Sequence, residues 1–324
     1  MSTAVLSAAK SLARERVRGL WIAIPTPFSD DGRHVEEDLL AASVEHYVEA
    51  LGVDGIFCGG VMGEFWALSL GERMRVHELV AERAGGRVPV MAQVGHHVFA
   101  DTVALADHAR AHGIEFGISM NPYYPPGLPD DLVREWYRRL DAAVSLPMFL
   151  FNTSYSGSSL SPELIDELAE LDIVCGIKNP RGREHLLRVQ ELAGDRIVVT
   201  DASERDWLEL HTEHGFQSLM STPALALYQA PGNTPVADYT RLADAGDFDG
   251  ARAISARLEP ARDAFDRWMR TPWTEHGTIP IAQLKEWLGL MGLPQGPVRP
   301  PLVALAGNER EELRRDLDAL GLLG

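Results

Sequence analysis

Lys178 is the side chain in this sequence whose type and position best suit covalent chemistry. Only three of the 30 basic residues are lysines, and Lys178 directly follows the apolar run 173–177, which is typical of a buried strand. Because burying an ammonium group is costly unless it is paired or deprotonated, burial lowers the pKa of a lysine. A neutral amine attacks carbonyl carbons. We therefore predict that Lys178 forms a Schiff base; the alternative is a structural ion pair with an acid on a neighbouring strand.

The elements that would position Lys178 alternate between short apolar runs and stretches of helical periodicity. Strands are predicted at residues 20–24, 55–60, 88–94, 116–120, 148–151, 173–177, 197–200 and 218–221. Helices are predicted between them at 35–51, 101–112, 130–144, 162–171, 184–193 and 204–214, with another after a capping box of Ser69 and Glu72. Strands that are apolar along nearly their whole length form parallel sheets covered on both faces. Eight such units favour a closed (β/α)₈ barrel, a TIM barrel, over an open doubly wound sheet.

The predicted barrel spans residues 19–235 and leaves a segment on either side. Residues 1–18 are expected to form an N-terminal helical segment, and residues 236–324 a C-terminal helical segment with a proline-rich break at 294–301. Active sites of β/α barrels lie at the carboxyl ends of the strands. Lys178 follows the sixth predicted strand, so we expect it to project into the mouth of the barrel.

Five short motifs, in order and on matching strands, resemble the dihydrodipicolinate synthase and N-acetylneuraminate lyase superfamily from about residue 19 to residue 301. They are Ile-Pro-Thr-Pro-Phe at 24–28, Gly-Gly-Val-Met-Gly-Glu at 59–64, Pro-Tyr-Tyr at 122–124, the strand from Leu-Pro at 146–147 to Phe-Asn at 151–152, and Gly-Ile-Lys at 176–178. The resemblance implies a TIM-barrel lyase that holds a 2-oxo acid such as pyruvate as an imine of Lys178. Such an enzyme makes or breaks a carbon–carbon bond, as an aldolase does, or eliminates water. The resemblance also implies a homotetramer, a dimer of dimers, and no cofactor is expected.

Three positions depart from the family's pattern. The paired threonines that grip the substrate carboxylate are replaced by Val61 and Met62, and the catalytic tyrosine is replaced by Phe151. No arginine follows at 152–157, where synthases that bind aspartate semialdehyde carry one. Hydrogen bonds to a charged group contribute roughly 1.5–3 kcal/mol each, so either the backbone amides of Met62 and Gly63 hold the carboxylate or the substrate is less polar there. We therefore predict a lyase that is not a true dihydrodipicolinate synthase.

Further side chains are candidates for the same site. The proton transfer of the missing tyrosine is assigned to Tyr155, and the resemblance implies that Tyr124 reaches a neighbouring subunit's site in a proton relay. The same proton transfer could instead use Tyr124, a histidine of the pair at 96–97 or an acidic group of the substrate. In that case Tyr155 is simply an exposed aromatic residue of the loop. His97 and Ser218 are expected to contact the substrate. No metal is expected at His96 and His97, because adjacent residues of an extended segment point in opposite directions.

Composition narrows the class of partner. The formal charge of −17, from 47 acidic and 30 basic residues, opposes binding to nucleic acids and to anionic membranes. No apolar run approaches the roughly 18 residues that span a bilayer. The charged N-terminal segment lacks a signal-peptide core, so a cytoplasmic enzyme with a small carbonyl substrate is expected. Two other functions stay open: a carbonyl-condensing enzyme of a secondary pathway with an apolar or aromatic partner, and a barrel that binds a carbonyl ligand without turnover.

Overall fold

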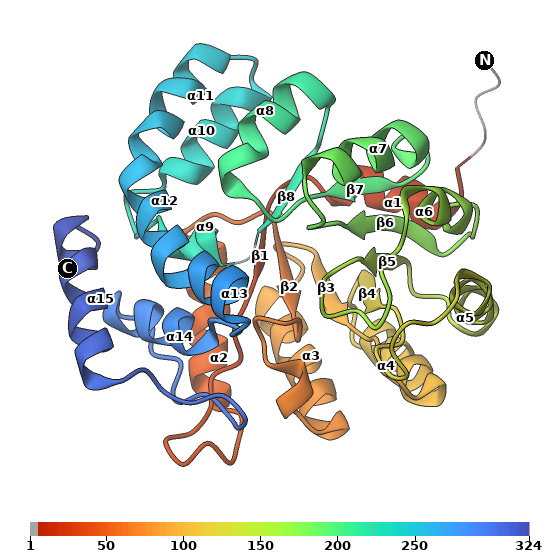
Figure 1. Cartoon of the computed structure of the whole chain (residues 1–324), viewed down its shortest axis with the longest axis horizontal. Helices are drawn as coiled ribbons and strands as arrows, with labels where there is room; N and C mark the ends of the chain where they lie inside the picture. Colours follow the sequence, from red (N-terminus) through yellow and green to blue (C-terminus); the bar gives the residue numbers. More distant parts are fainter. Residues whose placement is uncertain (1–5, 222, 324) are drawn as a thin grey trace.

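Eight parallel strands form the centre of the computed structural model, which describes residues 6–221 and 223–323 (Figure 1). The strands are β1 (Gly19–Ala23), β2 (Gly55–Cys58), β3 (Val90–Gln93), β4 (Phe116–Met120), β5 (Met148–Phe151), β6 (Val174–Lys178), β7 (Val198–Thr200) and β8 (Ser218–Ser221). They pair in the order β7-β6-β5-β4-β3-β2-β1-β8. A single parallel bridge between Asp201 and Leu219 joins the two edges. The predicted TIM barrel is confirmed as a nearly closed barrel.

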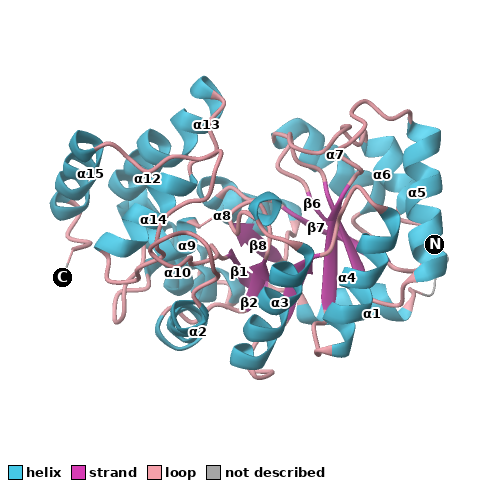
Figure 2. Cartoon of the chain, turned by 90° about the horizontal axis from the view of Figure 1, so that it is seen from below, coloured by secondary structure: helices cyan, strands magenta, loops and turns pink. Residues whose placement is uncertain are grey.

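Helices surround the strands on the outside of the barrel, as the view from below shows (Figure 2). Those of the barrel and the N-terminal segment are α1 (Ala8–Arg16), α2 (Glu37–Glu45), α3 (Leu70–Ala84), α4 (Phe99–Ala111), α5 (Asp130–Ala143), α6 (Pro162–Leu168), α7 (Arg183–Ala193), α8 (Glu204–His214) and α9 (Ala224–Leu227). The predicted capping box is confirmed at the start of α3, where Ser69 Oγ accepts from the Glu72 N–H and Glu72 accepts from the Ser69 N–H. Among the described residues, every helix is too short or too polar to cross a bilayer.

The apolar strands bury nearly all of their side chains, which is why they show no alternation in the sequence. Side chains inside the barrel pack so closely that one position on β6 has no room for a Cβ atom. A Cβ atom at Gly176 would lie 2.1 Å from the ring of Phe149, so β6 passes the neighbouring strand only because this position is glycine. Gly176 thereby fixes the path of the strand two residues before Lys178.

The C-terminal segment is helical, as predicted, and packs along one side of the barrel (blue in Figure 1). Its helices are α10 (Pro235–Asp244), α11 (Phe248–Ser255), α12 (Glu259–Phe265), α13 (Thr271–His276), α14 (Ile281–Leu290) and α15 (Gly307–Ala319), with a π-helical turn at Asp266–Arg270. A buried ion pair joins Lys285 of α14 to Glu64 in the loop after β2, and Glu64 also accepts from the Arg299 N–H at 3.0 Å. These contacts fix the C-terminal segment to a loop at the mouth of the barrel.

Candidate active site

Lys178 is the last residue of β6, and its side chain is only 2% exposed. Its Nζ lies 5.2 Å from the centre of the Phe57 ring and 5.5 Å from that of Phe151. Among the described residues, no carboxylate lies within ion-pair distance of this amine. Burial lowers the pKa of Lys178 to about 7, although the negative charge of nearby Asp201 acts in the opposite direction. The amine is therefore partly neutral near pH 7, which is the state that attacks a carbonyl carbon.

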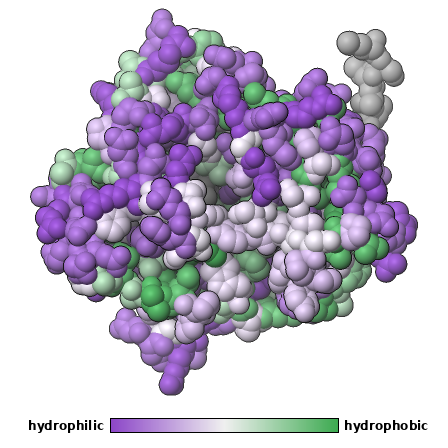
Figure 3. Space-filling view, in the orientation of Figure 1, coloured by the Kyte–Doolittle hydropathy of each residue, from purple (hydrophilic) through white to green (hydrophobic). Residues whose placement is uncertain are grey.

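A cavity of about 330 Å³ opens over Lys178 at the carboxyl ends of the strands. The face shown in Figure 3 is mostly hydrophilic and is hollowed near its centre. Both apolar and polar residues form the lining, which includes Ala23, Phe57, Val61, Met62, Phe151, Thr153, Asp201, Ser203, Asp206, Phe265, Arg270 and Trp273. Cavities of this size hold ligands considerably larger than pyruvate.

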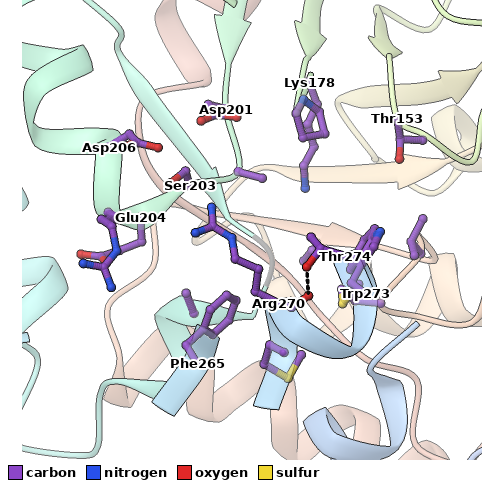
Figure 4. Close-up of a pocket in the computed structure, with 18 of the residues that line it drawn as sticks. Thr153, Lys178, Asp201, Ser203, Glu204, Asp206, Phe265, Arg270, Trp273 and Thr274 are labelled. Atoms are coloured by element: carbon purple, nitrogen blue, oxygen red, sulfur yellow. Dashed lines mark hydrogen bonds between the residues drawn. The ribbon is translucent and has the colours of Figure 1, made fainter. Parts of the chain in front are cut away.

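Asp201 directly follows β7, the strand that pairs with β6 and therefore lies next to the strand of Lys178 (Figure 4). Burial raises the pKa of its carboxyl group, while the backbone amides of Ala202 and Ser203 favour the charged form. Asp201 was not predicted from the sequence, because acidic residues are common where a loop begins after a strand and its residue type alone did not mark it. The signal that could have found it is its register, since it follows the strand adjacent to Lys178 and must share the same barrel mouth.

Val61 and Met62 line the cavity, and both side chains are buried. The Gly63 N–H donates to the Gly60 carbonyl at 3.1 Å, and the Gly63 carbonyl accepts from the Thr26 hydroxyl at 2.8 Å. Both backbone polar groups of Gly63 are therefore already hydrogen-bonded within this loop and to Thr26. Of the two amides considered for carboxylate binding, only that of Met62 lacks a backbone partner among the described residues.

Phe151, the last residue of β5, lines the cavity, and Tyr155 lies in the loop that follows. The Tyr155 ring packs against Trp273 of α13, with ring centres 5.1 Å apart. Burial raises the pKa of Tyr155 to about 12, so its hydroxyl stays protonated at neutral pH. Thr153, which sequence reasoning missed, is 3% exposed and lines the cavity. The same loop therefore offers two hydroxyl groups, one in the cavity and one beside it.

Five predicted site residues are absent from the described lining of the cavity: Gly63 and Tyr155, placed above, and Tyr124, His97 and Ser218. Tyr124, in the loop after β4, is 72% exposed. His97 is exposed, and its Nδ1 lies 2.9 Å from the Tyr123 hydroxyl. Ser218 begins β8 opposite Gly19, which places it at the amino end of the barrel and not at the mouth. The strand range was predicted well, but the residue at the carboxyl end of β8 is Ser221.

The prediction that His96 and His97 point in opposite directions is wrong. Their rings stack with centres 4.2 Å apart, because the chain bends after β3 instead of staying extended. His96 Nδ1 accepts from the Val98 N–H at 3.0 Å, which orients its ring. The stacked pair lies outside the described lining of the cavity.

Side chains of a kind that could hold a metal ion gather on the outer helices. Glu78 Oε1 of α3 lies 3.0 Å from Nε2 of His108 in α4 and 3.5 Å from Nε2 of His112, which directly follows α4. These are ligand types that zinc uses. None of the three residues lines the cavity over Lys178 among the described residues, so the arrangement has no direct bearing on that site.

Comparisons with known proteins agree with this architecture. The chain matches the dihydrodipicolinate synthetase family over residues 16–320. It is 29% identical to the 4-hydroxy-tetrahydrodipicolinate synthase of Methanopyrus kandleri over 316 residues, which cover 95% of this chain and 98% of that protein. It is 32% identical to an uncharacterized DapA-like lyase of Halobacterium salinarum over 315 residues, which cover 95% of each protein.

Solved structures of dihydrodipicolinate synthases also resemble this chain over nearly its whole length. The dihydrodipicolinate synthase of Acinetobacter baumannii, inhibited by chloride and complexed with pyruvate, matches with a TM-score of 0.80 and 25% sequence identity. The match covers 95% of this chain and all of that one. Another dihydrodipicolinate synthase structure matches with a TM-score of 0.79 and 26% identity over 94% of this chain.

Proposed function

The chain belongs to the dihydrodipicolinate synthetase family, as its motifs predicted, and is an enzyme of the lyase type; we propose that it works through an imine between Lys178 and a 2-oxo acid such as pyruvate. The observation that carries the proposal is the state of Lys178. A buried amine with a pKa of about 7, next to two aromatic rings at the base of a cavity, is suited to attack a carbonyl carbon. The pyruvate bound to the Acinetobacter relative supports this choice of substrate class.

The proposed reaction begins when the neutral amine of Lys178 adds to the carbonyl carbon and gives a carbinolamine. The carbinolamine oxygen takes up a proton and leaves as water, and a protonated imine remains. This imine withdraws electrons, so the adjacent carbon loses a proton to give an enamine, which attacks a second carbonyl compound. In the reverse direction the same carbon–carbon bond breaks. Hydrolysis of the imine then returns the amine.

Proton transfer in these steps requires groups on either side of Lys178. Thr153 and Asp201 line the cavity and come from the strands that flank β6, and the raised pKa of Asp201 suits a carboxyl group that both takes up and releases a proton. Tyr155, which packs against Trp273 of the lining, is proposed as a further hydroxyl donor. Tyr124 is proposed to serve the site of a neighbouring subunit.

The surroundings of the amine favour a substrate that is not aspartate semialdehyde. Val61, Met62 and Phe151 offer no side-chain hydrogen bonds, and the Gly63 amide is already engaged. An enzyme with this lining would accept an apolar or aromatic carbonyl partner and would not make dihydrodipicolinate efficiently. The second candidate function, a carbonyl-condensing enzyme of a secondary pathway, rests on the same apolar lining. His97 and Ser218 have no assigned contact in this proposal.

We also propose a cytoplasmic homotetramer built as a dimer of dimers. An exposed tyrosine such as Tyr124 is typical of interface positions, because its ring buries a large area and its hydroxyl finds a polar partner. Light scattering of the purified chain should give four times the monomer mass of 35.6 kDa. A Tyr124→Ala variant that still elutes as a tetramer would place Tyr124 outside the essential contacts.

The test of the imine uses the small number of lysines. Incubation with pyruvate and borohydride should add one reduced adduct, and peptide mapping should find it on Lys178. Lys285 is the matched control, since it is also buried but is paired with Glu64. An adduct confined to Lys10 or Lys285 would contradict the proposal. An adduct on Lys178 with no turnover of any aldehyde or 2-oxo acid would instead favour a carbonyl-binding barrel without catalysis.

A further inference from the structure

The C-terminal segment builds the outer wall of the cavity over Lys178. Phe265, Met269, Arg270 and Trp273, from the end of α12 to α13, all line it. Figure 4 shows Arg270 extending from this segment toward Ser203, with Lys178 pointing into the same space from the opposite wall. The Thr274 hydroxyl donates to the Arg270 carbonyl at 3.1 Å, which holds the backbone of the turn. An arginine from outside the barrel thus enters the barrel's own cavity.

Arg270 is the least neutralised of the four arginines that line this cavity. The other three have close carboxylate partners: Arg183 with Glu209, Arg205 with Glu259, and Arg262 with Glu204 and Glu259. The carboxylate contact of Arg270 among the described residues is with Asp266, at 3.4 Å, whereas charge-assisted hydrogen bonds measure about 2.7–2.9 Å. Asp266 is also shared with Arg205. The guanidinium, on a side chain that is 55% exposed, is therefore available to a ligand.

Apolar side chains and one acid, Asp201, line the cavity near the amine, and Arg270 lines it from the C-terminal segment. Phe57 and Phe151 lie next to the amine, Val61 and Met62 also line the cavity, and none of these four side chains can pair with a carboxylate. Trp273 presents an aromatic surface on the same segment as Arg270, and Tyr155 packs against its ring. A ligand that spans the cavity would place its carbonyl carbon at the inner end and its aromatic body and any acidic group at the outer end.

We propose that Arg270 and Trp273 form a recognition subsite for a carboxylate on the part of the substrate distant from the imine carbon, carried on an aromatic or otherwise flat apolar body. This inference rests on the proposed Lys178 imine for its place in the reaction, but the subsite itself binds through groups that the imine does not use. Arginine suits this task because its planar guanidinium donates two parallel hydrogen bonds to a carboxylate and stacks on aromatic faces. Arg270 is then a specificity-determining residue supplied from outside the barrel.

The experiment compares two aldehydes as partners for pyruvate, benzaldehyde and 4-carboxybenzaldehyde. The wild-type chain should give a kcat/KM at least tenfold higher for the carboxylated aldehyde, and Arg270→Gln should remove that preference. Arg270→Lys should restore only part of it, since an ammonium cannot make the paired hydrogen bonds. Arg267→Gln is the matched control: Arg267 lies on the same turn but pairs with Glu312 and Asp316 of α15.

Calorimetric titration with benzoate tests the subsite without the reaction. Arg270→Gln should weaken benzoate binding at least tenfold, whereas Arg267→Gln should bind it as the wild type does. Equal binding in wild type and Arg270→Gln, or an unchanged aldehyde preference, would overturn the subsite while leaving a trapped Lys178 adduct intact. Arg270-dependent benzoate binding without any pyruvate adduct would uphold the subsite and contradict the imine. If Arg270→Gln raises the pyruvate concentration needed for half-maximal trapping tenfold, Arg270 holds the carboxylate of the 2-oxo acid, and the distal placement is wrong.

Discussion

The ammonium group of Lys285 lies 2.6 Å from Oε1 of Glu64, and both side chains are buried. Burial lowers the pKa of Lys285, but Glu64 and the Pro297 carbonyl, which accepts at 2.9 Å, both favour the charged form. Lys178 is equally buried without such a carboxylate partner among the described residues. One buried lysine is therefore a structural cation, and the other is free for nucleophilic chemistry.

The rate of borohydride trapping at Lys178 should depend on pH with an apparent pKa near 7. Below pH 7 the rate should rise about tenfold per pH unit, because the neutral fraction of the amine rises in that proportion, and it should level off above pH 8. The measurement is adduct formation with excess pyruvate from pH 5 to 9. An apparent pKa near 10 would show that burial does not lower the pKa of this amine.

Lys178→Met should abolish trapping and stabilise the fold. The pKa of Lys178 is about 7 in the folded chain and near 10.5 when unfolded, so the unfolded state binds more protons between these values. Wild-type stability therefore rises with pH across this window, and the gain from Lys178→Met is fully present below pH 7 and disappears toward pH 10.5. The gain should be on the order of a few kcal/mol at pH 6. Urea unfolding at pH 6 and pH 9 measures it, and a variant less stable than wild type at pH 6 would contradict it.

Glu64→Gln should destabilise the chain by about 3–5 kcal/mol, because it leaves the Lys285 charge buried without its partner. The double variant Glu64→Gln/Lys285→Met should recover part of this loss. Arg310→Gln is the control, since it removes a partly exposed ion pair with Glu286 and should cost less than about 1 kcal/mol. Thermal and urea unfolding of the four proteins measure these differences. A double variant less stable than Glu64→Gln would show that Lys285 stabilises the fold by other contacts.

The barrel and the position of Lys178 could be predicted because both depend on local patterns. Runs of buried apolar residues mark the strands, and a lysine that ends such a run must lie at the mouth if the strands are parallel. The residue Ser218 shows the limit of this reasoning. The range of β8 was predicted correctly, but its first residue, Ser218, was chosen as the site residue. That residue lies at the amino end of the barrel, whereas the last residue, Ser221, lies at the carboxyl end.

The outer part of the site could not be predicted, because it depends on contacts between segments far apart in the sequence. Arg270 and Trp273 belong to a helical segment whose periodicity says nothing about which strands it covers. Asp201 and Thr153 follow the two strands that pair with β6, so the strand order accounts for their place near Lys178, but an acid or a hydroxyl after a strand is too common for its residue type alone to mark it. The stacking of His96 on His97 likewise follows from a bend that no residue pattern marks.

The last prediction concerns which hydroxyl replaces the missing tyrosine. Phe151 has none, whereas Thr153 lines the cavity and Tyr155 packs against Trp273, a residue of the lining. Proton transfer by a positioned group typically contributes 10²–10⁴-fold in rate, and it requires hydrogen-bond reach of the reacting oxygen. We therefore expect Thr153→Val to lower kcat about a hundredfold and Tyr155→Phe to lower it about tenfold. A Phe151→Tyr substitution in the Thr153→Val background should restore activity if the lost hydroxyl is the reason. Single-turnover imine formation measures this step directly; a larger loss in Tyr155→Phe than in Thr153→Val would assign the role to Tyr155, because only a hydroxyl within reach of the carbinolamine can produce it.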